Sequence, residues 1–415
     1  LYALDQIQGA NTTYNVPMLL EVNGELNIEK LKEAMQQVCN KHEILRTYFT
    51  SQDGKFLQIT EPKLKVDIKI EKLNKSNIYD VLEEHITPFD LSKLPLFRIL
   101  VINVSEGKNY VIFDIHHIIF DGESIPIFLQ DLSKFYNGDN VEECNFQYKD
   151  YSNWQNQKNL DLQKEYWLKK FSDDFNILNL YPDLPHKNYR SYEGETYPHL
   201  ISDSISQKVK TLAMNTGSTE YMILLSAFLI LLKKYSRQKD LIIGSPIAGR
   251  VHPETQKMLG MFVNTVAIRV NVGDDLNYLQ FLENVKEECF DIYENQEYPF
   301  EQLVEDLKLE RDNIHNPLFD VMFAYQNSES AKIVLNNTEI KVLPIHSKVS
   351  KFDLTLIVEE NNDGYRLDWE FCKDIFYKDT IIRMSNCFEQ ILENILDNPQ
   401  TPVQNLECVD AAEKH

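Results

Sequence analysis

Glycine, proline and cysteine are all scarce in this chain, and each shortage excludes a class of protein. Thirteen glycines and 15 prolines among 415 residues are too few for a low-complexity or fibrous sequence. The six cysteines are widely spaced and form no CxxC pair, so neither a zinc ribbon nor a thioredoxin-like redox motif is expected. We therefore predict reduced, mostly packed thiols.

Positive charge and long apolar runs are also lacking. Forty-two Lys and Arg residues against 64 Asp and Glu residues give a net charge of -22, which repels a phosphate backbone and disfavours nucleic acid as a partner. The longest mainly apolar stretch, Tyr221–Leu232, is shorter than the roughly 18 residues of a membrane span and predicts a buried helix. No signal-peptide pattern opens the sequence, so we expect a cytoplasmic domain without a membrane partner. We also expect the excised domain to be monomeric.

Several enzyme signatures are missing as well. The sequence contains no GxGxxG, GxxxxGK[ST], HExxH or GxSxG pattern. Dinucleotide-binding enzymes, P-loop proteins, zincin proteases and serine hydrolases of the nucleophile-elbow type are therefore disfavoured.

The pattern that is present predicts a two-lobed α/β (α+β) protein. A length of 415 residues allows two or three compact units at about 150 residues each. Periodicity fails over 177–194, which is typical of an interdomain connection, and this predicts an N-terminal lobe over 1–176 and a C-terminal lobe over 177–415. Apolar spacing predicts helices at about 28–42, 124–138, 203–214, 220–235, 277–294 and 378–397, and strands at 96–104, 110–117 and 240–244.

Two adjacent histidines end the second predicted strand. Pleat alternation points His116 and His117 to opposite faces, so only one of them can face a given site and the other is expected to support it. His117 precedes a loop containing Gly122 and a helix start at Ser124, where backbone N–H groups and the helix dipole favour negative charge. This placement is suited to stabilising a developing oxyanion.

The histidine pair is also compatible with simple packing and with metal binding. Both rings can be packing residues, since most histidines are not catalytic. His116, His117 and Asp121 are also metal-ligand types, but the strand splays the histidines apart, so no metal site is expected.

Arg46 is predicted to lie on a strand face suited to burial. Alternation along Glu43–Phe49 places it between Ile44 and Tyr48. An unpaired buried charge costs several kcal/mol, so this guanidinium requires a carboxylate partner.

Residues His116–Gly122 read HHIIFDG, which resembles the HHxxxDG signature of condensation domains of nonribosomal peptide synthetases, within the chloramphenicol-acetyltransferase-like superfamily. Other segments resemble further motifs of that family in the family order, and the resemblance covers essentially the whole chain. These segments are Leu1–Leu4, Lys41–Phe49, Pro88–Arg98, Tyr148–Gln155, Ile243–Arg250, Gly260–Thr265, Tyr298–Leu303 and Arg311–Leu318.

The resemblance implies two acetyltransferase-like lobes arranged in a V around a central tunnel. Upstream and downstream peptidyl carrier domains would deliver thioesters on 4'-phosphopantetheine arms, and the domain itself would bind no cofactor. The acceptor amine would attack the donor thioester, in a reaction resembling the type that joins two L-configured residues. An adjacent adenylation domain is expected in a longer parent synthetase, because the sequence begins inside a family motif and ends at Cys408–Glu413, which resembles the linker leading to an adenylation domain.

The same resemblance implies roles for individual residues. His117 stands at the active-site position, where it removes a proton or positions the substrate, and the Gly122 N–H is the expected oxyanion donor. Asp121 is expected to pair with Arg46, and His116 to support the site. The expected substrate-tunnel residues are Ser124, Trp154, Asn264 and Asn316.

Three alternatives remain. An epimerization domain shares the HHxxxDG motif but usually has Trp after the loop serine, where this sequence has Ile125. A coenzyme A-dependent acyltransferase of the same fold is the second, and a noncatalytic docking module is the third. The sequence also departs from the family pattern at Lys41, Asn295, Ile314 and His315, which leaves contacts open without touching the His117 position.

Overall fold

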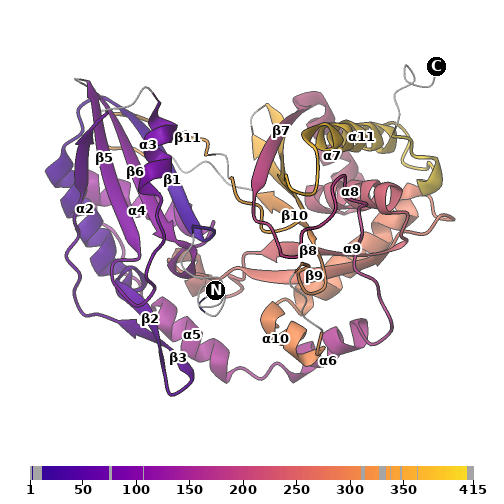
Figure 1. The fold of residues 1–415 in the computed structure, drawn as a ribbon, viewed down its shortest axis with the longest axis horizontal. Helices are drawn as coiled ribbons and strands as arrows, with labels where there is room; N and C mark the ends of the chain where they lie inside the picture. Colours follow the sequence, from indigo (N-terminus) through magenta and orange to yellow (C-terminus); the bar gives the residue numbers. More distant parts are fainter. Residues whose placement is uncertain are drawn as a thin grey trace. The chain divides into compact units, whose positions relative to one another are not determined.

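The computed structural model describes residue 2 and residues 12–73, 77–105, 107–309, 314–326, 333–336, 338–345, 348–361 and 363–408. The motif segment Leu1–Leu4, except Tyr2, and the pair Arg311 and Asp312 lie outside the described residues. The chain forms two compact units, each built from a sheet and helices (Figure 1).

Unit 1 comprises Leu1–Asn159, Arg250–Val263 and Glu329–Ile345. Its five-stranded sheet has the order β11-β1-β6-β5-β4, and β2 and β3 pair in a separate two-stranded sheet. The strands are β1 (Asn15–Asn23), β2 (Thr47–Gln52), β3 (Lys55–Thr60), β4 (Lys69–Lys72), β5 (Phe97–Ser105), β6 (Lys108–His116) and β11 (Glu339–Leu343). The helices are α2 (Ile28–Lys41), α3 (Ile78–His85), α4 (Ser124–Asn137) and α5 (Tyr148–Gln157).

Alternation along β6 divides the core of unit 1. Val111, Phe113 and Ile115 enter the cluster that contains the buried faces of α2 and α4, which pack against each other. Ile112 points to the other face and joins a smaller cluster with Ile78 and other residues of α3. This is the alternation expected from the sequence, and it places His116 on the same face of β6 as Ile112.

Unit 2 comprises Leu160–Gly249, Asn264–Ser328 and His346–His415. Its six-stranded sheet has the order β7-β13-β12-β10-β8-β9. The strands are β7 (Gly194–Ser202), β8 (Asp240–Ile247), β9 (Asn264–Asn271), β10 (Val321–Gln326), β12 (Leu354–Asn361) and β13 (Gly364–Cys372). The helices are α6 (Asp161–Lys170), α7 (Asp203–Thr216), α8 (Glu220–Ser236), α9 (Tyr278–Glu294), α10 (Phe300–Asp306) and α11 (Lys378–Asp397).

Helix α8 lies inside unit 2 because its side chains are apolar around most of its circumference. Its residues from Met222 to Leu232 are all buried, which confirms the buried helix predicted for Tyr221–Leu232. Within the described part of the chain, no single helix is long and apolar enough to span a membrane. Among the described residues, α7 and α8 pass that test only when taken together, and they are bent by 106° where they meet.

The six helices and three strands predicted from periodicity are confirmed to within a few residues at their ends. The chain first leaves unit 1 between Asn159 and Leu160, before the expected division at 176/177, and two later segments return to unit 1. The prediction of six reduced cysteines is wrong for one pair, since Cys387 and Cys408 are joined in a disulfide. Sequence spacing could not reveal that pair, because the C-terminal end of the described chain folds back onto α11.

Candidate active site around the loop after β6

His116 ends β6 and supports the turn that follows it. Its side chain is almost fully buried, and its Nδ1 accepts a hydrogen bond from the Ile118 N–H at 3.1 Å. Its ring also meets the Phe89 ring edge-on, with the centroids 5.9 Å apart. His116 therefore caps the short 3-10 turn His117–Ile119 from inside the protein.

His117 is the first residue of that turn and is held through its main chain. Its N–H donates to the Tyr14 carbonyl at 2.8 Å, and its carbonyl accepts from the Phe120 N–H at 3.2 Å. The residue as a whole is half-buried, whereas its neighbours Ile118 and Phe120 are buried. Hydrogen bonds thus hold both the N–H and the carbonyl of His117, while the residue stays partly accessible.

Asp121 is the buried anchor of the loop. It is fully buried, and its Oδ1 accepts from the Ser124 N–H at 2.8 Å, from the Ser124 hydroxyl at 2.7 Å and from Arg250 Nη2 at 2.9 Å. Its Oδ2 accepts from the Phe262 N–H at 3.0 Å. Donors thus reach both carboxylate oxygens, and the loop is tied to residues 250–263 of the same unit.

Arg250 completes this arrangement, which we call the closed cluster (Asp121, Ser124, Arg250 and Phe262). Its Nη1 donates to the carbonyl oxygens of Met258, at 2.7 Å, and Thr255. Its guanidinium also lies over the Phe262 ring at 4.2 Å. A planar, forked donor group is what this set of acceptors requires, so lysine would not replace it fully.

The expected pairing of Asp121 with Arg46 is therefore wrong. Arg46 ends a 3-10 turn, Glu43–Arg46, and is not part of a strand, so the alternation that predicted its place on a strand face does not apply to it. Its Nη1 donates to the Glu61 carbonyl at 2.6 Å, and its Nε lies 3.4 Å from the Cys39 carbonyl. The guanidinium instead contacts carbonyl groups at the end of α2, and it forms an ion pair with Glu43 at 3.6 Å.

Gly122 lies between Asp121 and the start of α4. A Cβ atom built at this residue would meet no heavy atom within 4 Å, so the space beside its backbone is open. Its carbonyl accepts from the Ile125 N–H at 3.1 Å, in the turn that leads into α4. The 14-residue helix α4 therefore starts directly beside the Gly122 peptide.

The four expected tunnel residues have different surroundings. Ser124 is fully buried, and its hydroxyl belongs to the closed cluster. Trp154 is 41% exposed and lines a cavity of about 250 Å³ in unit 1 with His252 and Met258. In unit 2, Asn264 donates to the Gln296 and Tyr298 carbonyls at 2.8 Å each, and Asn316 donates to the Lys351 carbonyl at 3.3 Å.

Arg250, Asp114 and Asp131 are buried ionic groups of unit 1 that were not singled out from the sequence. The only signal of Arg250 was its place at the end of the motif Ile243–Arg250. Asp114 pairs with Arg98 at 2.9 Å. Burial raises the pKa of Asp114 to about 6, although Arg98 and Asn15 act in the opposite direction.

Comparison with known proteins identifies the family. The family model described as "Condensation domain" matches residues 1–415. Bacitracin synthase 3 of Bacillus licheniformis is 38% identical over 419 residues, covering 100% of this chain and 7% of that protein. Surfactin synthase subunit 2 of Bacillus subtilis (strain 168) is 37% identical over 414 residues, covering 100% of this chain and 12% of that protein. The chain thus spans a small part of these relatives.

Solved structures share the fold at low sequence identity. The four-domain nonribosomal peptide synthetase AB3403 matches with a TM-score of 0.89 at 22% identity, over 97% of this chain and 33% of that one. The first condensation domain of the calcium-dependent antibiotic synthetase, solved with a substrate analogue, matches with a TM-score of 0.80 at 16% identity, over 98% and 97% of the two chains. From the family match and these relatives, the chain belongs to the condensation domains of nonribosomal peptide synthetases.

Proposed function

We propose that this domain forms a peptide bond between two carrier-bound aminoacyl or peptidyl groups, in the type of reaction that joins L-configured residues. The observation that carries the proposal is the half-buried His117, whose backbone is held on both sides at the end of β6. The partners would be upstream and downstream carrier domains with 4'-phosphopantetheine arms, next to an adenylation domain in the parent protein. Relatives named as bacitracin and surfactin synthases support this substrate class.

The chemistry assigns His117 a proton-transfer role. The acceptor α-amine has a reference pKa near 8, so roughly a tenth of it is neutral at pH 7 and able to attack. Attack forms the C–N bond and leaves a tetrahedral intermediate that carries an ammonium and an oxyanion. An imidazole with a reference pKa of about 6.5 is suited to take the ammonium proton before the C–S bond breaks and the donor thiolate leaves.

Gly122 would stabilise the oxyanion of that intermediate through its N–H. The open space beside Gly122 and the adjacent start of α4 support this role, because a helix N-terminus favours negative charge. The closed cluster would act indirectly, since it holds the backbone between His117 and α4 in one conformation.

The test is a single-turnover assay with donor and acceptor aminoacyl groups loaded on carrier domains, read by intact mass of the acceptor. We expect dipeptide on the acceptor arm, and a rate that falls by about 10²- to 10⁴-fold in His117→Ala. His85→Ala is the matched control, because His85 bonds the Val81 carbonyl at the end of α3. Equal rates for His117→Ala and the wild type would contradict the role of His117.

The same assay separates the alternatives. Exchange of the donor α-proton with solvent deuterium, without condensation, would indicate epimerization. Competition by free coenzyme A thioesters would indicate a coenzyme A-dependent acyltransferase. If the assay shows neither of these signals and no condensation, a docking module is favoured. A protein of related fold, the X-domain from teicoplanin biosynthesis, has been solved in a complex with OxyB.

A further inference from the structure

A cluster of ionisable side chains lies in unit 2, apart from the loop after β6. Asp320 directly precedes β10 and Asp353 directly precedes β12. These strands are parallel neighbours with Val321 opposite Leu354, so both carboxylates lie at the same end of adjacent strands. His315 belongs to the loop before β10, and its Nδ1 lies 2.8 Å from Asp320 Oδ2.

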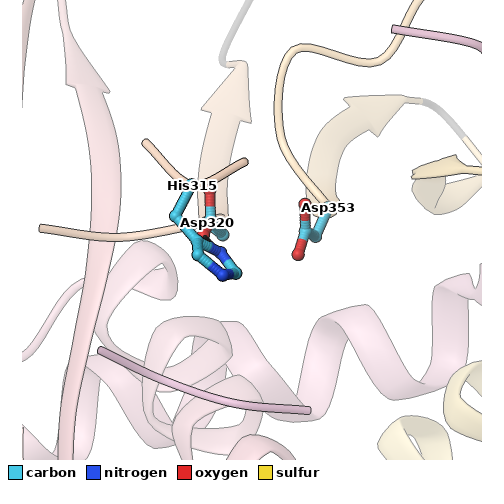
Figure 2. Close-up of side chains that lie close together, drawn as sticks. All are labelled: His315, Asp320 and Asp353. Carbon is cyan, nitrogen blue, oxygen red and sulfur yellow. Dashed lines mark hydrogen bonds and ion pairs between the residues drawn. The ribbon is translucent and has the colours of Figure 1, made fainter. Parts of the chain in front are cut away.

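The three side chains face a common space. Figure 2 shows His315 beside Asp320, with Asp353 opposite them, and one ligand atom from each residue lies within 4.8 Å of the other two. The Asp320 and Asp353 side chains are 3% and 16% exposed, whereas the His315 side chain is 37% exposed. All three line a cavity of about 370 Å³, together with His186, whose ring centroid is 5.1 Å from that of His315.

The two carboxylates of this cavity share the guanidinium of Arg190. Arg190 Nη1 lies 2.9 Å from Asp320 Oδ1, but its Nη2 is 3.9 Å from Asp353 Oδ1. The same guanidinium also donates to the carbonyls of Ile314, at 3.0 Å, and Lys351, at 2.7 Å. One guanidinium therefore lies near two carboxylates, and these carboxylates repel each other when both are ionised. We call His186, Arg190, His315, Asp320 and Asp353 the open cluster.

We propose that His315, Asp320 and Asp353 bind a divalent transition-metal ion of the zinc class, with His186 as the proposed fourth ligand. Imidazole nitrogen combined with carboxylate oxygen suits zinc, whereas calcium and magnesium prefer oxygen ligands alone. At zinc–ligand distances of about 2.0–2.1 Å, tetrahedral ligand atoms lie about 3.3 Å apart. The present ligand atoms all lie within 4.8 Å of one another, so binding requires them to close by at most about 1.5 Å. Rotation of the partly exposed His315 ring would exchange its contact with Asp320 Oδ2 for a bond to the ion, and the ion would tie the loop before β10 to the start of β12.

The test is a Zn²⁺ titration of the 415-residue chain, after treatment with a chelator, by isothermal calorimetry in competition with a chromophoric chelator. We expect one tightly bound equivalent in the wild type. His315→Arg should weaken Zn²⁺ binding at least tenfold, because arginine still donates to Asp320 but cannot ligate a metal. Asp353→Asn should weaken it by a similar factor, whereas His199→Ala should bind as the wild type, since His199 pairs with Glu389 elsewhere in unit 2.

Folding is checked by the melting temperature of each metal-free variant. If His315→Arg melts early, Asp353→Asn decides the result, because asparagine keeps the shape of the side chain. The proposal is overturned if the wild type binds no stoichiometric Zn²⁺, or if both variants bind it as tightly as the wild type. Tighter binding of Mg²⁺ than of Zn²⁺ would overturn the assigned class of metal.

Discussion

Each unit contains a buried aspartate–arginine pair with the same N–O distance of 2.9 Å, but the two pairs have different surroundings. In unit 1, the Asp121 and Arg250 side chains are 0% and 2% exposed, and the neighbours that bond the carboxylate are all donors. In unit 2, the Asp320 and Arg190 side chains are 3% and 12% exposed. A second carboxylate and an imidazole also lie beside this pair. The pair in unit 1 is thus closed off from solvent, whereas the carboxylate of the pair in unit 2 lines a cavity with a second carboxylate.

The largest expected effect comes from opening the closed cluster. Arg250→Ala should lower the free energy of unfolding by about 3–5 kcal/mol, because it leaves the Asp121 carboxylate buried without its cation. Urea denaturation followed by circular dichroism measures this loss. Arg250→Lys is the matched control. Its free energy of unfolding should lie between those of the wild type and Arg250→Ala, since lysine keeps the charge but not the forked donor geometry. A loss below about 1 kcal/mol for Arg250→Ala would show that this pair does not hold the loop.

Asp114 in unit 1 tests how much a buried carboxylate lowers the free energy of unfolding when its partners do not compensate fully for its burial. Its pKa is raised to about 6 by burial, against about 3.9 in an unfolded chain. Between these values the folded state binds more protons, so this group lowers the stability of the wild type as the pH rises from about 4 to about 6. Asp114→Asn should therefore be more stable at pH 8 by up to about 3 kcal/mol, and the advantage should vanish below about pH 4.

Urea denaturation of the wild type and Asp114→Asn across this pH range checks the prediction. Arg98 remains beside the asparagine in the variant and its side chain is 36% exposed, so the loss of its partner is partly screened by water. An advantage that is constant with pH would mean that the change comes from packing and not from ionisation.

The smaller expected effect belongs to the open cluster. Arg190→Ala removes the guanidinium from Asp320 and Asp353, but the adjoining cavity and the exposed edge of His315 admit water. We expect a loss of about 1–3 kcal/mol, the range for a buried polar group that loses its partner. Added Zn²⁺ should restore stability to this variant more than to Arg190→Ala combined with Asp353→Asn, because a ligand stabilises only the state that binds it. Urea denaturation with and without Zn²⁺ measures both effects, and a loss as large as that of Arg250→Ala would remove the distinction between the clusters.

Elements with strong periodicity could be predicted from the sequence, whereas the partners of charged groups could not. Helix α8 and strand β6 followed from local apolar spacing, although the predicted strand included His117, which lies in the 3-10 turn after β6. The partner of Asp121 was missed because Arg250 is 129 residues away and no local pattern connects them. The open cluster was missed for a similar reason, since only the parallel pairing of β10 and β12 brings Asp353 beside Asp320.

The last prediction separates the observed partner of Asp121 from the expected one. Arg46→Ala should cost only about 1 kcal/mol, because Arg46 serves carbonyl groups at the C-terminal end of α2. In double-mutant cycles with Asp121→Asn, the interaction energy with Arg250→Ala should reach about 1–3 kcal/mol, whereas that with Arg46→Ala should stay within about 0.5 kcal/mol of zero. Urea denaturation of the single and double variants measures both cycles. Strong coupling of Asp121 to Arg46 would restore the pairing expected from the sequence, and it would mean that Arg250 holds residues 250–263 without holding the loop of His117.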